Sequence, residues 1–382
     1  MGEWLEKRMD EIADFNPRES IPKGIIAKKI AMDKLQPFCR DVPSFEMEAF
    51  SGGTKFRNGD TIMARITPCL ENGKTAMVDV LDDNEVGFGS TEYIVFRAKE
   101  GNDPDFVYYL VTSPEVREPA IKSMVGSSGR QRVQTDVVQG LKVRVPDLEG
   151  QRAIAGMLKI LDDKIAANRR VNENLQEQAQ AIYDHMIVEN ADASWTPGVL
   201  SDIAIITMGQ SPKGESYNEE GIGTVFFQGR AEFGFRFPTR RLYTTDPKRM
   251  ARTNDALMSV RAPVGDMNVA YEDCCIGRGL GAIHSKDGHQ SFVLYTMFAL
   301  REQLNVFNGE GTVFGSINRD ALNSLPVDIP PKGIMDQFED IVTPMDAAIR
   351  NNYEEICRLQ AMRDILLPRL MAGEIDVSDI EL

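Results

Sequence analysis

The chain has 382 residues, which is too long for one ordinary domain and indicates two or three. Its 42% hydrophobic content is sufficient for at least two cores, yet no apolar run is long enough to span a membrane. The polar N-terminus, which has no apolar h-region, predicts that there is no secretory signal, and five irregularly spaced cysteines favour a reducing cytoplasm over a disulfide scaffold. A formal net charge of −15 argues against a lone nucleic-acid-binding protein, so DNA binding would require local basic patches.

Residues 1–147 predict a first globule with a β-rich core. Short alternating runs at 61–66, 75–80 and 92–97 predict strands, and Gly, Asn and Pro residues separate them. A helix is expected at 104–113. The Gly/Ser loop at 126–132 carries two arginines, and such a loop can hold a phosphate through backbone amides and guanidinium groups.

Residues 148–190 predict a long central spacer helix. Its seam residues recur at alternating spacings of four and three, which is typical of coiled-coil packing. A polar Asn168 in this seam costs stability but fixes the register. Asp162 and Asp163 are expected to be solvent-facing charges. The seam comprises Ile154, Leu158, Leu161, Ile165, Asn168, Asn172, Leu175, Ala179, Ile182 and Met186.

Residues 191–333 predict a second globule. Strands are expected at 256–260 and 268–271, and a helix at 290–301. The segment 224–262 holds eight basic and three acidic residues with six interleaved aromatic residues. This composition suits a phosphate-contacting surface, although a solvated face with aromatic side chains in the core explains it equally well.

Residues 334–373 predict a second long helix, and 374–382 form an acidic tail. The helix repeats the four–three spacing, and its Asp346 is expected to face solvent as Asp162 does. Its seam comprises Phe338, Val342, Met345, Ile349, Asn352, Ile356, Leu359, Arg363, Leu366 and Leu370.

The two halves of the chain are similar to each other. Residues 136–146 align with 320–330 at an offset of 184, which continues without a gap into both helices. The two tryptophans, Trp4 and Trp195, fall at matching points. We therefore predict an α+β protein with two similar globules, separated by two long antiparallel coiled-coil helices in a pseudo-two-fold repeat.

The sequence lacks a recognisable catalytic set. It contains no nucleotide-binding phosphate loop, no Asn/Asp-Pro-Pro-aromatic signature of amino-methyltransferases, and no nuclease-like acidic pair followed by Glu-x-Lys. His185 is expected to be an ordinary helix residue. His284 and His289 follow the adjacent Cys274 and Cys275, which are poorly spaced for zinc, so neither a metal site nor an enzyme is expected.

The order globule, helix, globule, helix resembles the specificity (S) subunit of type I restriction–modification systems. Matching features are the segment 53–68, Gly89-Ser-Thr-Glu-Tyr93, Ile276-Gly-Arg-Gly-Leu-Gly281, the prolines 146 and 330 before the heptads, and the ending at 366–375. The resemblance covers nearly the whole chain. It implies that the globules are target-recognition domains, each reading half of a bipartite DNA site.

The resemblance also implies the partners. The helix pair would set the spacing between half-sites and dock two modification (M) subunits, which methylate adenine. Motor–nuclease (R) subunits join them for restriction. This chain would be non-catalytic and hold no cofactor, because S-adenosylmethionine and ATP belong to the partner subunits. It would work in the cytoplasm on double-stranded DNA, with no membrane association.

Arginine pairs well with guanine, and asparagine or glutamine with adenine, although most such contacts in a complex go to phosphates. An alternative stays open, namely a cytoplasmic coiled-coil scaffold with two ligand-binding globules and no DNA role. The acidity favours this alternative, whereas a neighbouring adenine methyltransferase gene would favour the specificity-subunit interpretation. The DNA-binding candidates are Lys55, Arg57, Arg65, Lys74, Arg130, Gln131, Arg132, Gln228, Arg230, Arg236, Arg240, Arg241, Arg261 and Arg278.

Overall fold

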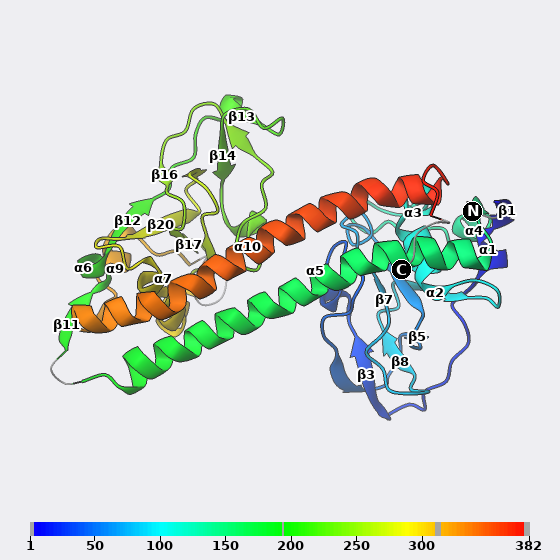
Figure 1. Ribbon diagram of the computed structural model, residues 1–382, viewed down its shortest axis with the longest axis horizontal. Helices are drawn as coiled ribbons and strands as arrows, with labels where there is room; N and C mark the ends of the chain where they lie inside the picture. Colours follow the sequence, from blue (N-terminus) through cyan, green and yellow to red (C-terminus); the bar gives the residue numbers. More distant parts are fainter. Residues whose placement is uncertain (1–3, 193–194, 310–314, 378–382) are drawn as a thin grey trace. The chain divides into compact units, whose positions relative to one another are not determined.

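The computed structural model describes residues 4–192, 195–309 and 315–377, so the last five residues of the predicted acidic tail lie outside it. The chain divides into two compact units (Figure 1), Met1–Arg170 with Asn352–Leu382, and Val171–Asn351. Each unit combines one globule with segments of both long helices. The predicted domain boundaries, which separate globules from helices, stay a prediction.

The globule of unit 1 contains two four-stranded sheets, ordered β2-β9-β6-β7 and β4-β3-β8-β5, and a two-stranded sheet β1-β10. Helix α2 follows β9 and packs on the first sheet. It begins where the side chain of Asp103 accepts a 3.0 Å hydrogen bond from the amide of Phe106, with Pro104 as the first helical residue. The elements are β1 (Leu5–Arg8), α1 (Met9–Ile12), β2 (Ala13–Phe15), β3 (Ile26–Ile30), a 3₁₀ turn (Met32–Lys34), β4 (Glu46–Ala49), β5 (Thr54–Phe56), β6 (Thr61–Ala64), β7 (Thr75–Met77), β8 (Gly87–Gly89), β9 (Tyr93–Ala98), α2 (Pro104–Thr112), α3 (Pro114–Lys122), α4 (Thr135–Gln139) and β10 (Lys142–Val145).

The globule of unit 2 repeats this plan. Its sheets are ordered β12-β20-β17-β18, β13-β15-β14-β19-β16 and β11-β21. The parallel pair β3–β8 of unit 1 has its counterpart in β14–β19. The elements are β11 (Thr196–Val199), α6 (Leu200–Ile203), β12 (Ala204–Met208), β13 (Tyr217–Asn218), β14 (Thr224–Phe227), β15 (Tyr243–Thr244), β16 (Met250–Ala251), β17 (Ala256–Ser259), β18 (Met267–Val269), β19 (Cys274–Ile276), β20 (Leu280–Ser285), α7 (Gln290–Ala299), α8 (Arg301–Asn305), α9 (Arg319–Asn323), β21 (Pro326–Ile329) and 3₁₀ turns at Gly214–Ser216, Arg230–Glu232 and Val306–Asn308.

Two long helices appear as continuous ribbons in Figure 1: α5 (Leu148–Tyr183), which continues as a π-helical segment (Asp184–Glu189), and α10 (Lys332–Met371). In unit 1 they run antiparallel, because Asp162 contacts Arg363 and Asn168 contacts Glu355. In unit 2, Asn172 contacts Ile349, and the rings of Tyr183 and Phe338 lie 5.7 Å apart, which gives the same direction.

The seam positions are the reason why these helices form and pair. None of the described seam side chains is exposed, and the apolar ones at Ile154, Leu158, Phe338 and Val342 are fully buried. Alternating four–three spacing keeps one stripe facing the partner helix, and burial of that stripe stabilises both helices. The predicted α+β class and the order globule, helix, globule, helix are confirmed.

Candidate nucleic-acid interface

Three segments of unit 2 end at one edge of its globule. The amide of Val260, after β17, donates a 3.0 Å hydrogen bond to the carbonyl of Gly279, and the amide of Gly279 donates to the carbonyl of Gln228 at 3.1 Å. A Cβ at Gly279 would lie 2.8 Å from the oxygen of Gln228, so the close approach requires glycine. These contacts bring Gln228, Arg261 and Arg278 together. We call the surface that these three residues form the unit 2 edge.

The unit 2 edge contains an open cavity of about 550 Å³. Both Arg261 and Arg278 line it and are exposed. Among the residues that the structure describes, no carboxylate pairs with either guanidinium group. The edge therefore presents two uncompensated positive charges and the exposed amide of Gln228, which are suited to an anionic ligand with base-like hydrogen-bonding groups.

The other basic candidates of unit 2 have carboxylate partners. Arg230 pairs with Asp266 at 2.7 Å, and Arg241 pairs with Glu232 at 2.8 Å. Arg240 pairs with Glu272 while its guanidinium group lies over the ring of Tyr271. These three arginines remain exposed, but their charge is partly compensated. The expected charge excess of 224–262 is therefore smaller than its composition indicates.

Arg236 lies elsewhere. Its side chain is buried against the long helices, where it pairs with Asp346 and donates to the hydroxyl of Tyr295 at 3.3 Å. A guanidinium group in this position cannot reach a ligand at the surface, so Arg236 does not belong to the unit 2 edge.

Unit 1 has an equivalent edge around the Gly/Ser loop. The amide of Arg65 donates to Glu92, and the amide of Thr67 donates to Gln131, at 2.9 and 3.0 Å. An isolated antiparallel bridge joins Ile66 to Arg132, as one joins Arg261 to Ser316 in unit 2. We call this group, Arg65 with Arg130, Gln131 and Arg132, the unit 1 edge.

Charge at the unit 1 edge is also partly compensated. Arg132 forms a two-pronged ion pair with Glu92, with its shortest distance at 2.6 Å, and this pairing lowers the pKa of Glu92. Arg130 is exposed, and no carboxylate within the described ranges pairs with it. Arg65 is half-buried and donates to the carbonyl of Val133 at 3.2 Å. The Glu92 partner was not foreseen, since it lies 40 residues from Arg132.

Three candidates have side chains that are held by partners outside the unit 1 edge. Arg57 pairs with Glu19 at 2.6 Å, and Lys74 donates to the carbonyl of Met32 at 2.8 Å. Lys55 lies over the ring of Phe50, with 4.9 Å from its ammonium nitrogen to the ring centre. All three are half-buried and hold structural partners.

The two asparagines of the first helix seam are buried and donate hydrogen bonds to the other long helix. Asn168 donates to Glu355 at 2.7 Å, and Asn172 donates to the carbonyl of Ile349 at 3.3 Å. The expectation that Asp162 faces solvent is wrong, because its side chain is 5% exposed and pairs with Arg363. Asp346 is half-buried rather than freely solvated, since Arg236 and Tyr295 both contact it.

The three histidines lie apart. His185 is exposed on the π-helical segment, and His284 pairs with Asp255 at 2.6 Å. His289 is buried between Asp287 and Asp336. Within the described residues, no cluster of three His, Cys, Asp or Glu side chains is arranged to bind a metal ion. None of the helices in that part of the chain is both long and apolar enough to cross a bilayer.

Comparison with known proteins identifies both halves of the chain. Residues 1–177 and 194–359 match the type I restriction modification DNA specificity domain. A Methanocaldococcus jannaschii protein assigned as the specificity subunit of the type I restriction enzyme MjaX is 29% identical over 72% of this chain and 69% of its own. The Haemophilus influenzae HindI specificity subunit is 22% identical over 84% of this chain and 87% of its own.

A solved structure also shares the fold. The S subunit of a type I restriction–modification system from M. genitalium superposes with a TM-score of 0.58 at 15% identity, over 96% of each chain. At this identity the likeness concerns the arrangement of elements alone.

Proposed function

The chain belongs to the type I restriction–modification specificity family, and from that premise we propose that each of its globules reads one half of a bipartite site in double-stranded DNA. The single observation that supports this most is the repetition of one loop edge. Each globule carries one exposed arginine in an isolated bridge at this edge, Arg132 in the bridge to Ile66 and Arg261 in the bridge to Ser316, although the arginine lies on opposite members of the two bridges. A repeated DNA-reading surface fits a site that has two halves.

At the unit 2 edge, Arg261 and Arg278 are the proposed principal contacts. Uncompensated guanidinium groups can bind phosphates or pair with guanine, and the amide of Gln228 can pair with adenine. Arg230, Arg240 and Arg241 are further proposed phosphate contacts. Their carboxylate partners lower the local positive charge, so we assign them a smaller share of the affinity.

At the unit 1 edge, Arg130 is the proposed principal contact, and Gln131 and Arg132 lie beside it in the same loop. Arg65 supports the loop through its backbone. Lys55, Arg57 and Lys74 are peripheral in this proposal, because their half-buried side chains already hold partners. The two edges differ in their principal contacts, Arg130 in unit 1 and Arg261 with Arg278 in unit 2, and this difference fits two half-sites of different sequence.

The long helices have a proposed second role. They set the spacing of the half-sites and dock two adenine methyltransferase subunits, and R subunits join where restriction occurs. Side chains outside the seam support a docking face, since Ile341, Met362 and Ile365 of α10 are exposed. S-adenosylmethionine and ATP belong to those partners, this chain being non-catalytic, and the complex works on DNA in the cytoplasm. The scaffold alternative has no comparable support, because both halves match a DNA specificity domain.

The test separates the two edges. Methylated motifs are determined by long-read sequencing in a host that expresses the partner methyltransferase with either of two variants of this chain. Arg261→Ala with Arg278→Ala should relax or abolish one half of the motif, and Arg130→Ala with Arg132→Ala should affect the other half. Arg252→Ala is the control, since this exposed residue lies at the opposite end of the β17–β20 pair. Equal damage to both halves by both variants would contradict the assignment.

A further inference from the structure

A buried carboxylate joins the globule of unit 1 to its helices. Asp162 of α5 accepts a 2.8 Å hydrogen bond from the hydroxyl of Tyr109 in α2. It also forms a 2.8 Å ion pair with Arg363 in α10. The same guanidinium group donates to the carbonyl of Phe38, in the globule, at 3.0 Å. One polar cluster therefore connects three parts of the unit: the globule and both helix segments.

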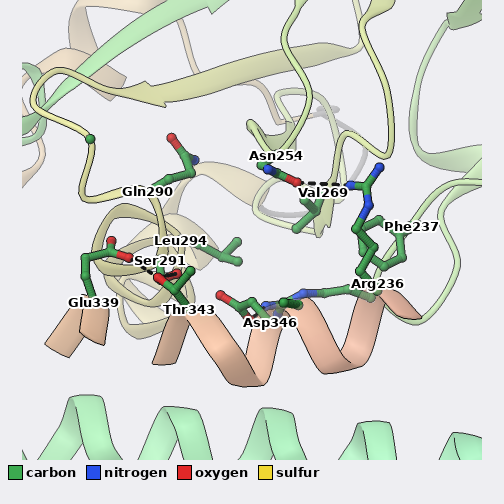
Figure 2. A pocket seen from close by; sticks show the side chains of 13 residues that line it. Arg236, Phe237, Asn254, Val269, Gln290, Ser291, Leu294, Glu339, Thr343 and Asp346 are labelled. Carbon is green, nitrogen blue, oxygen red and sulfur yellow. Dashed lines mark hydrogen bonds and ion pairs between the residues drawn. The ribbon is translucent and has the colours of Figure 1, made fainter. Parts of the chain in front are cut away.

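The arrangement recurs in unit 2. Asp346 of α10 occupies the position that is equivalent to Asp162, and Tyr295 of α7 corresponds to Tyr109 and donates to its carboxylate at 3.1 Å. Arg236, from a loop of the globule, pairs with Asp346 and donates to Gln176 of α5 at 3.2 Å. Figure 2 shows Arg236 extending along α10 to Asp346. Again one polar cluster connects the globule with both helix segments, here with Arg236 making the contact to α5.

The two clusters share the Tyr–Asp bond but differ in the source of the arginine, which is a helix in unit 1 and the globule in unit 2. The repeated feature is thus the Tyr–Asp hydrogen bond between a helix of the globule, α2 or α7, and the long helix of the same repeat, α5 or α10. We call each of these contacts, with its arginine, the joint of its unit. A buried charge with directed hydrogen bonds accepts few geometries, because a shift leaves polar groups unsatisfied in a low-dielectric interior. Such a cluster therefore adds a directional constraint to the packing of the globule on the helices.

Packing at the unit 2 joint is incomplete. A cavity of about 230 Å³ lies between the globule and α10, and Arg236, Leu294, Asp346 and Ala347 line it (Figure 2). Because side chains do not fill this space, the polar cluster supplies a larger part of the constraint there. The joint of unit 1 has a smaller cavity of about 50 Å³ beside Tyr109 and Asp162.

We propose that Tyr109–Asp162 and Tyr295–Asp346 are positioning pairs for DNA recognition. They fix the angle of each globule on the spacer helices and thereby restrict the gap between half-sites that the complex accepts. The half-site sequences are read elsewhere, at the two edges. This inference rests on the proposed function, because it requires that both globules read DNA.

The experiment compares methylated motifs produced by complexes that contain Asp162→Asn or Asp346→Asn. Asparagine keeps the size of the side chain but removes the charge. Asp163→Asn and Asp340→Asn, at exposed positions of the same helices, are the matched controls. Tyr109→Phe and Tyr295→Phe remove one hydroxyl each and serve where an Asn variant does not fold.

The expected result is a gain in spacing tolerance with unchanged half-sites. Sites whose gap differs by one base pair should gain methylation by on the order of tenfold relative to wild type, the factor that about 1.4 kcal/mol produces. The controls should keep the single native gap.

Three results would overturn the inference. The first is that the Asn variants methylate only sites with the native gap, whatever the level of methylation, and the second is that the half-site sequences change. The third is complete loss of methylation in both the Asn and the Phe variants. Absence of a bipartite motif with the wild-type chain would instead refute the proposed function, so the two failures are distinguishable.

Discussion

Arg363 and Asp162 form an ion pair 2.8 Å long between two buried side chains that are 201 residues apart in the sequence. Burial raises the pKa of Asp162 in spite of this partner, which shows how strongly the site is desolvated. A charge in such a place is tolerable only while its partner is present. The two residues therefore depend on each other more than surface pairs do.

Replacing Arg363 with methionine should lower the free energy of unfolding by about 3–5 kcal/mol, because it leaves Asp162 buried and unpaired. Denaturant unfolding of the purified chain measures this change. Arg369→Met is the control, since the side chain of Arg369 is 53% exposed and a surface pair contributes about 1 kcal/mol or less. Equal losses in the two variants would contradict the account of the pair.

The heptad spacing predicted the helix seams because a repeat of seven residues leaves a direct record in the sequence. It could not predict the environment of Asp162. That environment depends on Tyr109 and Arg363, which reach the carboxylate from distant segments. Local pattern thus identifies which face of a helix is buried, but the partner of a charge is decided by the tertiary fold.

The basic segment 224–262 illustrates the same limit. Composition indicated a positive surface, and the structure does place Arg261 at an open edge. It also buries Arg236 and pairs Arg230 and Arg240 with acids that lie outside the segment, Asp266 and Glu272. Counting charges within a window misses partners that neighbouring strands supply.

DNA binding by the full complex should weaken when Arg261 and Arg278 are both replaced with alanine. The slope of log K against log salt should decrease by about 0.9 for each phosphate contact that is lost. Fluorescence anisotropy with target duplex at several salt concentrations measures both quantities. The Arg252→Ala variant should match wild type, and an unchanged slope in the double variant would remove these residues from the phosphate contacts.

Gly279→Ala should reduce DNA affinity through the shape of the unit 2 edge rather than its charge. The new Cβ would lie 2.8 Å from the carbonyl oxygen of Gln228, so the loop that carries Arg278 must shift. Gly214→Ala is the control, because nothing lies within 4 Å of a Cβ at that exposed position. If both variants bind target DNA like wild type, the close approach has no part in shaping the edge.

His289 should make stability depend on pH. Burial lowers its pKa, but the hydrogen bond to Asp336 and the ion pair with Asp287 outweigh this effect and raise the pKa above its ordinary value of 6.5. The protonated form is therefore favoured in the folded state. Its stabilisation is fully present below pH 6.5 and is lost as the pH rises through the folded-state pKa.

Unfolding free energies of wild type and His289→Gln, measured across this range, should differ most at low pH and converge as the pH rises. His185→Gln is the control, since His185 is exposed. A difference between wild type and His289→Gln that stays constant with pH would show that His289 does not titrate in this range.

The proposed function is that this chain gives a type I methyltransferase complex its bipartite DNA specificity. Sequencing of N6-methyladenine in the native host, with and without the gene, tests it most directly. Deletion should remove one methylated motif, made of two short half-sites separated by a fixed gap. An unchanged methylome in a strain that expresses the partner methyltransferase would contradict it.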